Sequence, residues 1–409
     1  MIDVAAIEAA RQNLSGVLLS TPTLFSPRLS EDVGGQIFVK AENLQRAGSF
    51  KLRGAYNKLV SLSQAERRSG VVAASMGNHA QGVALAARLL GITATIVMPE
   101  LAPLAKITAT RRYGAEVILH GQSFDEAIAH ARMLCETEGM TLVHAFDDPL
   151  IVAGQGTIGL EILEALPEVG TIIVPIGGGG LIGGIASAVR ARKPNTRIIG
   201  VQAAGCAAVQ PSLDAGEPVT IPQASTIADG IAIKRPGGIT LPLIRDLVEE
   251  IATVDEGEIA QAIMYVLQNL SLLVEGAGAV GVAALLNRKI EPRANERVCI
   301  VLSGGNIDPI LLDRVIDQVL VQNGRYLVLR TSVTDQPGNL AEMTEQIAAA
   351  GANVVDIMHR RAAWGVPLDR TGIEMILEVR DNAHGQAVIE RLSEHGYRVS
   401  KVGNDEYRA

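Results

Sequence analysis

The chain has 409 residues, of which 48% are hydrophobic, which is enough to bury a large core and to form more than one domain. Its 36 Lys and Arg residues against 44 Asp and Glu residues give a formal net charge of -8, and no cluster of basic residues stands out. Nucleic acid and anionic membrane surfaces are therefore poor candidate partners. The cysteines form no CxxC pair, and we predict that all are reduced core residues of a cytoplasmic protein: Cys135, Cys206 and Cys299.

Two stretches bear on the location of the protein. Residues 1–8 carry acids where a signal peptide would carry bases, so no export is expected. Residues 171–189 carry no charge, but Pro175 and four consecutive glycines argue against a membrane-spanning helix. We interpret this second stretch as a strand, a turn and a buried helix.

A lysine between two glycines is the first candidate for chemistry. The apolar run 37–43 is followed by the sequence Gly-Ser-Phe-Lys-Leu-Arg-Gly over residues 48–54. Because glycines let the backbone bend closely around a ligand, Lys51, which follows Phe50, is a candidate amine for an imine with a carbonyl compound. The alternative is a solvated lysine that begins a helix over residues 52–59.

Three segments repeat the order strand, glycine-containing turn and helix. The expected strands and their turns are 70–75 with 76–79, 171–176 with 177–180, and 298–302 with 303–306. Units of this kind predict parallel sheets. They also bring clusters of free backbone N–H groups to the carboxyl ends of strands, where open α/β sheets bind their ligands.

The tetraglycine turn has three interpretations. Residues 178–183 satisfy GxGxxG, but a dinucleotide site also needs an acid at the end of the next strand, and that strand ends in Gln202. Four backbone amides at a helix N-terminus form a nest for the phosphate of another cofactor. The third interpretation is close helix–sheet packing alone. An imine-forming lysine together with a phosphate nest is the combination that pyridoxal 5'-phosphate requires.

The C-terminal part of the chain has a different pattern. Strands are expected at 326–333, 353–359, 373–379 and 397–402, and helices at 339–350 and 383–395. This order predicts a ferredoxin-like βαββαβ domain in which residues 360–372 form the central loop. It contains no convincing set of catalytic residues, so binding or regulation is the expected role. The predicted division is a catalytic domain over 1–320, with a smaller subdomain at roughly 45–145, then a linker over 321–325 and a regulatory domain over 326–409.

Five motifs carry a resemblance to a known family. They are Gly-Ser-Phe-Lys-Leu-Arg-Gly-Ala (48–55), Ser-Met-Gly-Asn-His-Ala-Gln-Gly (75–82), Gly-Gln-Gly-Thr (154–157), the tetraglycine with Leu181, and Ser-Gly-Gly-Asn (303–306). With them, residues 1 to about 320 resemble the fold type II pyridoxal-phosphate enzymes, which have a tryptophan synthase β-like α/β fold. The closest resemblance is to the threonine dehydratase (threonine ammonia-lyase) and serine racemase branch. Residues 326–402 resemble an ACT domain, with 335–340 at its usual ligand-side loop.

The resemblance implies a role for each matched residue. Lys51 would hold the cofactor as an imine and later move the substrate's α-proton, and Phe50 would contact the cofactor. Asn78 would hydrogen-bond the cofactor's 3'-oxygen, while Ser303 would face the pyridine nitrogen. The phosphate would lie on Gly177, Gly178, Gly179, Gly180 and Leu181. The substrate carboxylate would lie on Ser75, Met76, Gly77, Asn78 and His79, although an isolated histidine such as His79 more often has a supporting role.

Two departures from serine racemase narrow the expected reaction. The racemase carries a second serine as acid/base where this chain has Met76, and methionine cannot deliver a proton. The ligands of the racemase's divalent metal would fall at Gln202, Cys206 and Ala208, and neither of the required carboxylates is present. We therefore expect elimination rather than racemisation, and no divalent metal at that place; a monovalent ion elsewhere stays open.

The expected function is α,β-elimination of water from L-threonine, which gives 2-oxobutanoate and ammonia; L-serine would give pyruvate. The alternatives are a dehydratase of serine or 3-hydroxyaspartate, or a non-catalytic regulator that binds amino acids. Isoleucine or valine is the expected effector of the ACT domain. A homodimer or homotetramer is expected.

Overall fold

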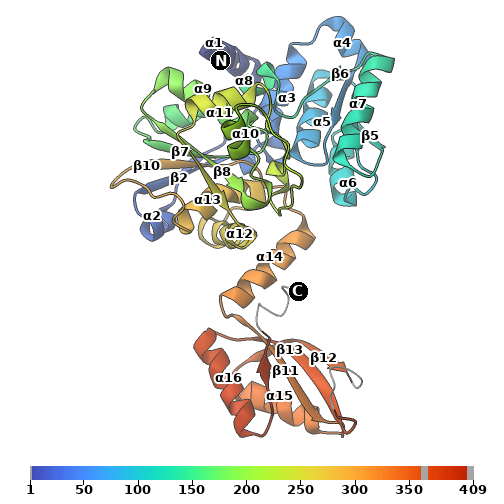
Figure 1. Cartoon of the computed structure of the whole chain (residues 1–409), viewed down its shortest axis with the longest axis vertical. Coiled ribbons are helices and arrows are strands. Elements are labelled where there is room, and N and C mark those ends of the chain that lie inside the picture. Colours follow the sequence, from blue (N-terminus) through green and yellow to red (C-terminus); the bar gives the residue numbers. More distant parts are fainter. Residues whose placement is uncertain (1, 361–366, 403–409) are drawn as a thin grey trace. The chain divides into compact units, whose positions relative to one another are not determined.

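The structure is a computed structural model that describes residues 2–360 and 367–402. It divides into two compact units, Met1–Leu311 and Leu312–Ala409 (Figure 1). The division falls within α14 (Pro309–Gln322). The sequence predicts that the first domain ends at residue 320, which lies in the same helix. The function assigned to each domain stays a prediction. No helix of the described residues is long and apolar enough to cross a membrane.

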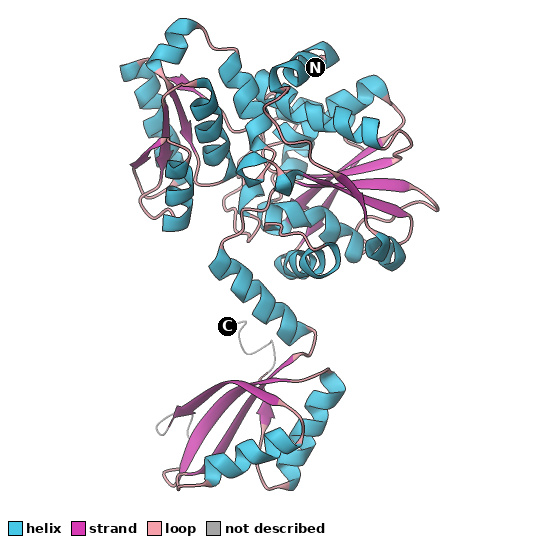
Figure 2. Ribbon diagram, turned by 180° about the vertical axis from the view of Figure 1, so that it is seen from behind, coloured by secondary structure: helices cyan, strands magenta, loops and turns pink. Residues whose placement is uncertain are grey.

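The first unit contains two sheets, which confirms the predicted α/β class with parallel sheets. The six-stranded sheet has the order β1 (Thr23–Phe25), β2 (Gln36–Ala41), β10 (Arg297–Leu302), β7 (Thr171–Pro175), β8 (Arg197–Ala203), β9 (Glu250–Val254). The four-stranded sheet has the order β5 (Glu116–Leu119), β4 (Ala94–Met98), β3 (Val71–Ala74), β6 (Thr141–Leu142). Every pair is parallel except β1 with β2. Figure 2 shows both sheets with their helices.

Helices connect these strands and cover the sheets. They are α1 (Val4–Leu14), α2 (Pro27–Val33), α3 (Lys51–Val60), α4 (Gln64–Ser69), α5 (Asn78–Leu90), α6 (Leu104–Arg112), α7 (Phe124–Glu138), α8 (Pro149–Ala165), α9 (Gly180–Arg192), α10 (Val209–Ala215), α11 (Thr240–Leu247), α12 (Glu256–Leu270) and α13 (Gly276–Leu286). Short 3-10 helices are η1 (Glu42–Leu44), η2 (Arg46–Gly48), η3 (Ala204–Cys206) and η4 (Asp229–Ile231).

The buried strands explain why the sequence folds into this layered unit. In β3, Val71 and Ala73 pack in the cluster that contains residues of α5, whereas Val72 and Ala74 pack in the cluster that contains residues of α7. Because alternate side chains of a strand point to opposite faces, the two helices cover opposite faces of the four-stranded sheet. An all-apolar strand of this kind is stable only when both faces are covered.

Glycines bring the helices behind the site into backbone contact. A Cβ atom on Gly184 of α9 would lie 2.7 Å from the backbone nitrogen of Gly156 in α8. A Cβ atom on Gly154 would lie 2.6 Å from the Cα atom of Gly54 in α3. The Gly-Gln-Gly-Thr motif therefore lets α3, α8 and α9 pack closely, and Gln155 Oε1 accepts a hydrogen bond from the Gly54 N–H at 3.2 Å.

The second unit has the predicted βαββαβ order, which confirms the ferredoxin-like fold. Its elements are β11 (Tyr326–Thr334), α15 (Asn339–Ala349), β12 (Asn353–Arg360), β13 (Arg370–Glu378), α16 (Asn382–Glu394) and β14 (Ser400–Lys401). The sheet order is β12-β13-β11-β14, and all pairs are antiparallel. Burial alternates along β11, so one face of the sheet packs against the helices. Residues 361–366 of the predicted central loop lie outside the described residues.

Candidate active site

The predicted imine lysine, Lys51, is the first residue of α3, which follows β2 and the two short helices η1 and η2. The preceding turn has positive φ angles at Ala47 (62°) and Gly48 (69°). It then pairs with the third glycine turn: the Phe50 N–H donates to the Ser303 carbonyl at 3.2 Å, and Ser49 forms a β-bridge with Gly304. The tertiary structure therefore joins two of the predicted motifs, which are about 250 residues apart in the chain.

The surroundings of Lys51 make its amine a nucleophile. Burial lowers the pKa of Lys51 to about 8, although the nearby carboxyl of Glu275 opposes this shift. About a tenth of this lysine is therefore the neutral amine at pH 7, far more than for an ordinary lysine, and imine formation requires the neutral amine. Its Nζ atom donates to the Ala145 carbonyl at 3.0 Å and lies 5.2 Å from the centroid of the Phe50 ring.

The tetraglycine turn lies next to the same segment, because Phe146 follows Ala145. A Cβ atom on Gly178 would lie 2.4 Å from the Phe146 ring, and one on Gly180 would lie 3.0 Å from the Cα and Cβ atoms of Phe146. Gly179 has a φ angle of 94°, and Gly180 begins α9 without a side-chain cap. The first N–H groups of this helix therefore have no side-chain acceptor and can take an anion. A side chain at Gly178 or Gly180 would clash with Phe146.

Two further residues outside the predicted set support this turn. Thr240 Oγ1 donates to the Gly178 carbonyl at 2.5 Å. Asp147 accepts hydrogen bonds from the backbone N–H groups of Gly238 and Ile239 at 2.9 and 2.8 Å, and so holds the segment that leads to Thr240. No sequence motif identified them, since their partners are 62 to 92 residues away and the contacts are to backbone.

The second glycine turn supplies Asn78, which lies in the first turn of α5 rather than in the turn predicted over 76–79. The helix begins earlier than expected because Gly77 serves as its N-cap residue. Asn78 Nδ2 donates to Glu275 Oε1 at 2.5 Å, and Asn78 Oδ1 accepts from Asn306 Nδ2 at 2.7 Å. One N–H of the amide therefore has no protein partner in the described part of the chain, which fits the expected hydrogen bond to a cofactor oxygen.

The neighbours of Asn78 in this turn differ in chemistry. Ser75 Oγ accepts from the Gly77 N–H at 3.2 Å. Met76 packs against the hydrophobic cluster of the four-stranded sheet. His79 is buried, its Nε2 contacts the Val143 carbonyl at 2.9 Å, and burial, then the charge of Lys51, lowers its pKa to about 3. His79 is therefore neutral and held by the fold, which suits a supporting role.

Glu275 is a residue of the site that was not predicted. It is 4% exposed and contacts Asn78. The sequence does contain a signal for this residue, because Glu275 is the only charged residue between Glu258 and Arg288. An isolated acid in such an apolar run is rarely buried without a partner.

The fit of this site to pyridoxal phosphate can be tested on the chain itself. The hydroxyl of Ser49, two residues before Lys51, is buried and has no hydrogen-bond partner in the described part of the chain. Together with the uncapped amides of α9 and the neutral fraction of Lys51, it offers donors for a phosphate and an amine for an aldehyde. The residues present therefore fit this cofactor.

The region of the expected racemase-type metal has another use. Gln202 Oε1 accepts from the Val209 N–H at 3.2 Å, so this side chain holds the segment after β8. Among residues 2–360 and 367–402, no three His, Cys, Asp or Glu side chains gather as metal ligands would. The absence of a divalent metal stays a prediction.

Comparison with known proteins agrees with the geometry. The model of the family "Pyridoxal-phosphate dependent enzyme" matches residues 14–304. An L-threonine ammonia-lyase of Thermotoga maritima is 48% identical over 403 residues, which cover 98% of this chain and 100% of the relative.

Two solved structures are also similar. Maize serine racemase is 37% identical with a TM-score of 0.74, covering 78% of this chain and 98% of that one. Threonine deaminase isoform 2 of Solanum lycopersicum is 38% identical with a TM-score of 0.73, covering 78% of this chain and 87% of that one. This chain therefore belongs to the family of pyridoxal-phosphate-dependent enzymes.

Proposed function

We infer that this chain is a pyridoxal-phosphate-dependent threonine ammonia-lyase, which converts L-threonine to 2-oxobutanoate and ammonia. The water lost from the substrate is added back when the enamine product is hydrolysed, so the net reaction releases only these two products. The near-full-length similarity to an L-threonine ammonia-lyase supports this substrate. The observation that carries the chemistry is the half-buried Lys51, with its lowered pKa, next to the uncapped glycine turn of α9.

We propose the following roles for the residues of the site. The bound cofactor supplies an electron sink for the carbanion at the substrate's α-carbon. Lys51 holds the cofactor as an imine, with Phe50 beside it, and moves the α-proton. Asn78 donates to the cofactor's 3'-oxygen, and Ser303 faces its pyridine nitrogen. The phosphate lies on Gly177, Gly178, Gly179, Gly180 and Leu181. The substrate carboxylate lies on Ser75, Met76, Gly77, Asn78 and His79.

The packing of Met76 supports elimination over racemisation. A racemase needs a proton carrier on each face of the α-carbon, and the thioether of Met76, which packs in a hydrophobic cluster, carries no proton. The alternatives that remain are a dehydratase of serine or 3-hydroxyaspartate, and a non-catalytic regulator. We further propose a cytoplasmic homodimer or homotetramer.

The test is the release of 2-oxo acid from L-threonine, L-serine and 3-hydroxyaspartate by the purified, cofactor-loaded protein. We expect the highest kcat/KM with L-threonine and measurable turnover of L-serine. A preference for 3-hydroxyaspartate would transfer the proposal to that dehydratase. No turnover of any of the three, together with no visible absorbance from an imine-bound cofactor, would favour the regulator.

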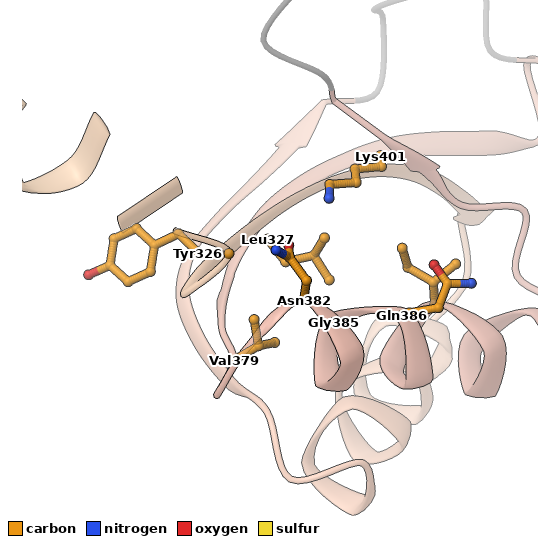
Figure 3. A pocket seen from close by; sticks show the side chains of 9 residues that line it. Tyr326, Leu327, Val379, Asn382, Gly385, Gln386 and Lys401 are labelled. Carbon is orange, nitrogen blue, oxygen red and sulfur yellow. The ribbon is translucent and has the colours of Figure 1, made fainter. Parts of the chain in front are cut away.

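We propose that the second unit binds a branched-chain amino acid, isoleucine or valine, as an effector. A cavity of about 230 Å³ in this unit suits a ligand smaller than a drug molecule. It lies at the start of β11, and residues 335–340, which the sequence predicted as the ligand-side loop, do not line it. In Figure 3 the Lys401 side chain extends from β14 toward Asn382 at the start of α16, while the Tyr326 ring points away. Lys401 and the Asn382 amide would bind a carboxylate, and apolar lining residues would take the aliphatic chain: Leu327, Val379 and Ile389.

Gly385 allows this effector site to be tested without unfolding the unit. A Cβ atom there would meet only the methyl groups of Leu327 and Val379, at 3.7 to 3.9 Å, so a side chain would enter the cavity rather than strike backbone. We expect Gly385→Leu and Lys401→Met each to weaken the response of threonine turnover to isoleucine or valine by about tenfold, with basal turnover unchanged. An unaltered response in both variants would place the effector elsewhere, and a wild type indifferent to both amino acids would contradict regulation.

A further inference from the structure

The carboxyl of Glu275 contacts an amide instead of the helix that follows it. Glu275 is the N-cap residue of α13, where a side-chain oxygen normally accepts from the first free N–H groups of the helix. Its carboxyl makes no such hydrogen bond. Oε1 accepts instead from Asn78 Nδ2, at 2.5 Å, in a place where both residues are buried. The contact with Asn78, and not capping of α13, therefore sets the orientation of the Glu275 side chain.

A chain of hydrogen bonds fixes the orientation of the Asn78 amide. Asn306 Nδ2 donates to the backbone carbonyl of Ala47 at 2.8 Å and to Asn78 Oδ1 at 2.7 Å. The Ala47 carbonyl can only accept a hydrogen bond, so the NH₂ group of Asn306 must face it. The same NH₂ group contacts Asn78, so the Asn78 atom on that side must be the acceptor Oδ1. The Asn78 amide then presents its N–H groups on the side of Glu275.

Two glycines enclose the contact between the carboxyl and the amide. A Cβ atom on Gly304 would lie 2.4 Å from Glu275 Oε1 and 3.0 Å from Asn78 Nδ2. A Cβ atom on Gly230 would lie 3.1 Å from Glu275 Oε1. Gly304 directly follows Ser303, so Glu275 lies against a segment of the candidate site while being shielded from solvent. A carboxyl buried in this position must either be protonated or have its negative charge balanced by positive charges or hydrogen-bond donors nearby.

The charges around Glu275 couple it to Lys51. Burial, then the negative charge of Asp229, raises the pKa of Glu275 to about 8, while Asn78, Lys106 and Lys51 oppose the shift. Ionised Glu275 in turn favours the protonated form of Lys51, against the effect of burial. Burial therefore opposes the charge on both groups, and the charge of each group stabilises that of the other.

We propose that Glu275 is a positioning residue for cofactor attachment: it holds the Asn78 amide so that one N–H remains for the cofactor, and its charge governs how readily Lys51 loses its proton. This inference rests on the proposed cofactor site. Glu275 need not touch the substrate to act in this way. The Asn78 amide and the Lys51 amine are the two groups through which it acts.

The test uses the full-length protein freed of cofactor, with pyridoxal phosphate as the probe. The rate of imine formation is followed by visible absorbance across pH, and the dissociation constant by fluorescence. Glu275→Gln keeps an acceptor for Asn78 but loses the charge. We expect it to bind the cofactor within about threefold of wild type and to move the midpoint of imine formation to lower pH by about half a unit or more. Glu275→Leu leaves the Asn78 N–H unpaired and should raise the dissociation constant by about tenfold.

Glu258→Gln is the matched control, because Glu258 is a half-buried carboxylate whose partners are the Asp255 N–H at the start of α12 and Lys289, and it should leave both quantities unchanged. Far-ultraviolet circular dichroism and thermal unfolding identify a variant that fails to fold; if Glu275→Leu does so, the pH midpoint of Glu275→Gln decides. An unshifted midpoint in Glu275→Gln overturns the inference while the cofactor site stands. Failure of the wild type to form the imine would overturn the cofactor site as well.

Discussion

Lys51→Ala is expected to lower 2-oxo acid release from L-threonine by at least about 10⁴-fold, because one amine both binds the cofactor and moves the α-proton. The buried surroundings that lower the pKa of Lys51 to about 8 make it the amine in this site that can carry out both steps near neutral pH. The variant should also lose the visible absorbance of an imine with the cofactor. These two readouts separate loss of the covalent bond from a general loss of structure.

Lys58→Ala is the matched control for this prediction. Lys58 lies on the same helix, two turns from Lys51, and its Nζ atom pairs with Asp148 at 2.7 Å. Loss of this partly exposed ion pair should cost about 1 kcal/mol or less and leave turnover within a few-fold of wild type. If Lys51→Ala retained the visible imine absorbance and substantial turnover, another amine would be the catalytic residue.

Arg53→Met is expected to lower the free energy of unfolding of the first unit by about 3 to 5 kcal/mol, since it leaves the buried carboxylate of Glu42 without its charged partner. Arg53 and Glu42 are both 0% exposed, and they are joined by two hydrogen bonds of 2.8 Å. Arg53 also contacts Glu161 at 2.5 and 2.9 Å. Burial acts to lower the pKa of Arg53, but the two carboxylates outweigh it and raise that pKa, so the guanidinium stays charged.

The same contacts explain why this loss should also affect the site. Arg53 lies two residues after Lys51 on α3, and its partners lie in η1 and α8. The network therefore joins α3, which carries Lys51, to η1 at the end of β2 and to α8. We expect reduced cofactor affinity in Arg53→Met even at temperatures where it remains folded.

Equilibrium unfolding in urea, followed by circular dichroism, measures this effect. Arg11→Met is the control, because Arg11 forms ion pairs with Glu8 and Glu164 at the surface, where such pairs contribute about 1 kcal/mol or less. Equal losses in the two variants would show that the buried network contributes no more than a surface ion pair. In that case the hydrogen bond that Thr157 Oγ1 accepts from Arg53 Nη1, at 3.0 Å, would also contribute little to stability.

Local sequence patterns were sufficient to predict the strand, turn and helix units and the type of chemistry they support. Apolar strands followed by glycine turns predicted parallel sheets, because strands buried on both faces need apolar residues throughout and the tight turns after them need glycine. Glycine-containing motifs identified Lys51 and the tetraglycine as candidates, while Asn78 and Ser303 were assigned through the resemblance to a known family. The βαββαβ order of the second unit followed from alternating strands and helices, since each element is specified by its own short-range pattern.

The contacts between residues far apart in the chain could be identified only from the folded structure. The partners of Asn78 are Glu275 and Asn306, and Phe146 packs against the tetraglycine turn. No local period encodes such contacts, because they depend on how the two sheets and their helices pack. Glu275 and Arg53 show the physical reason most clearly. A buried charge is tolerated only next to specific partners, and those partners come from segments up to about 200 residues away.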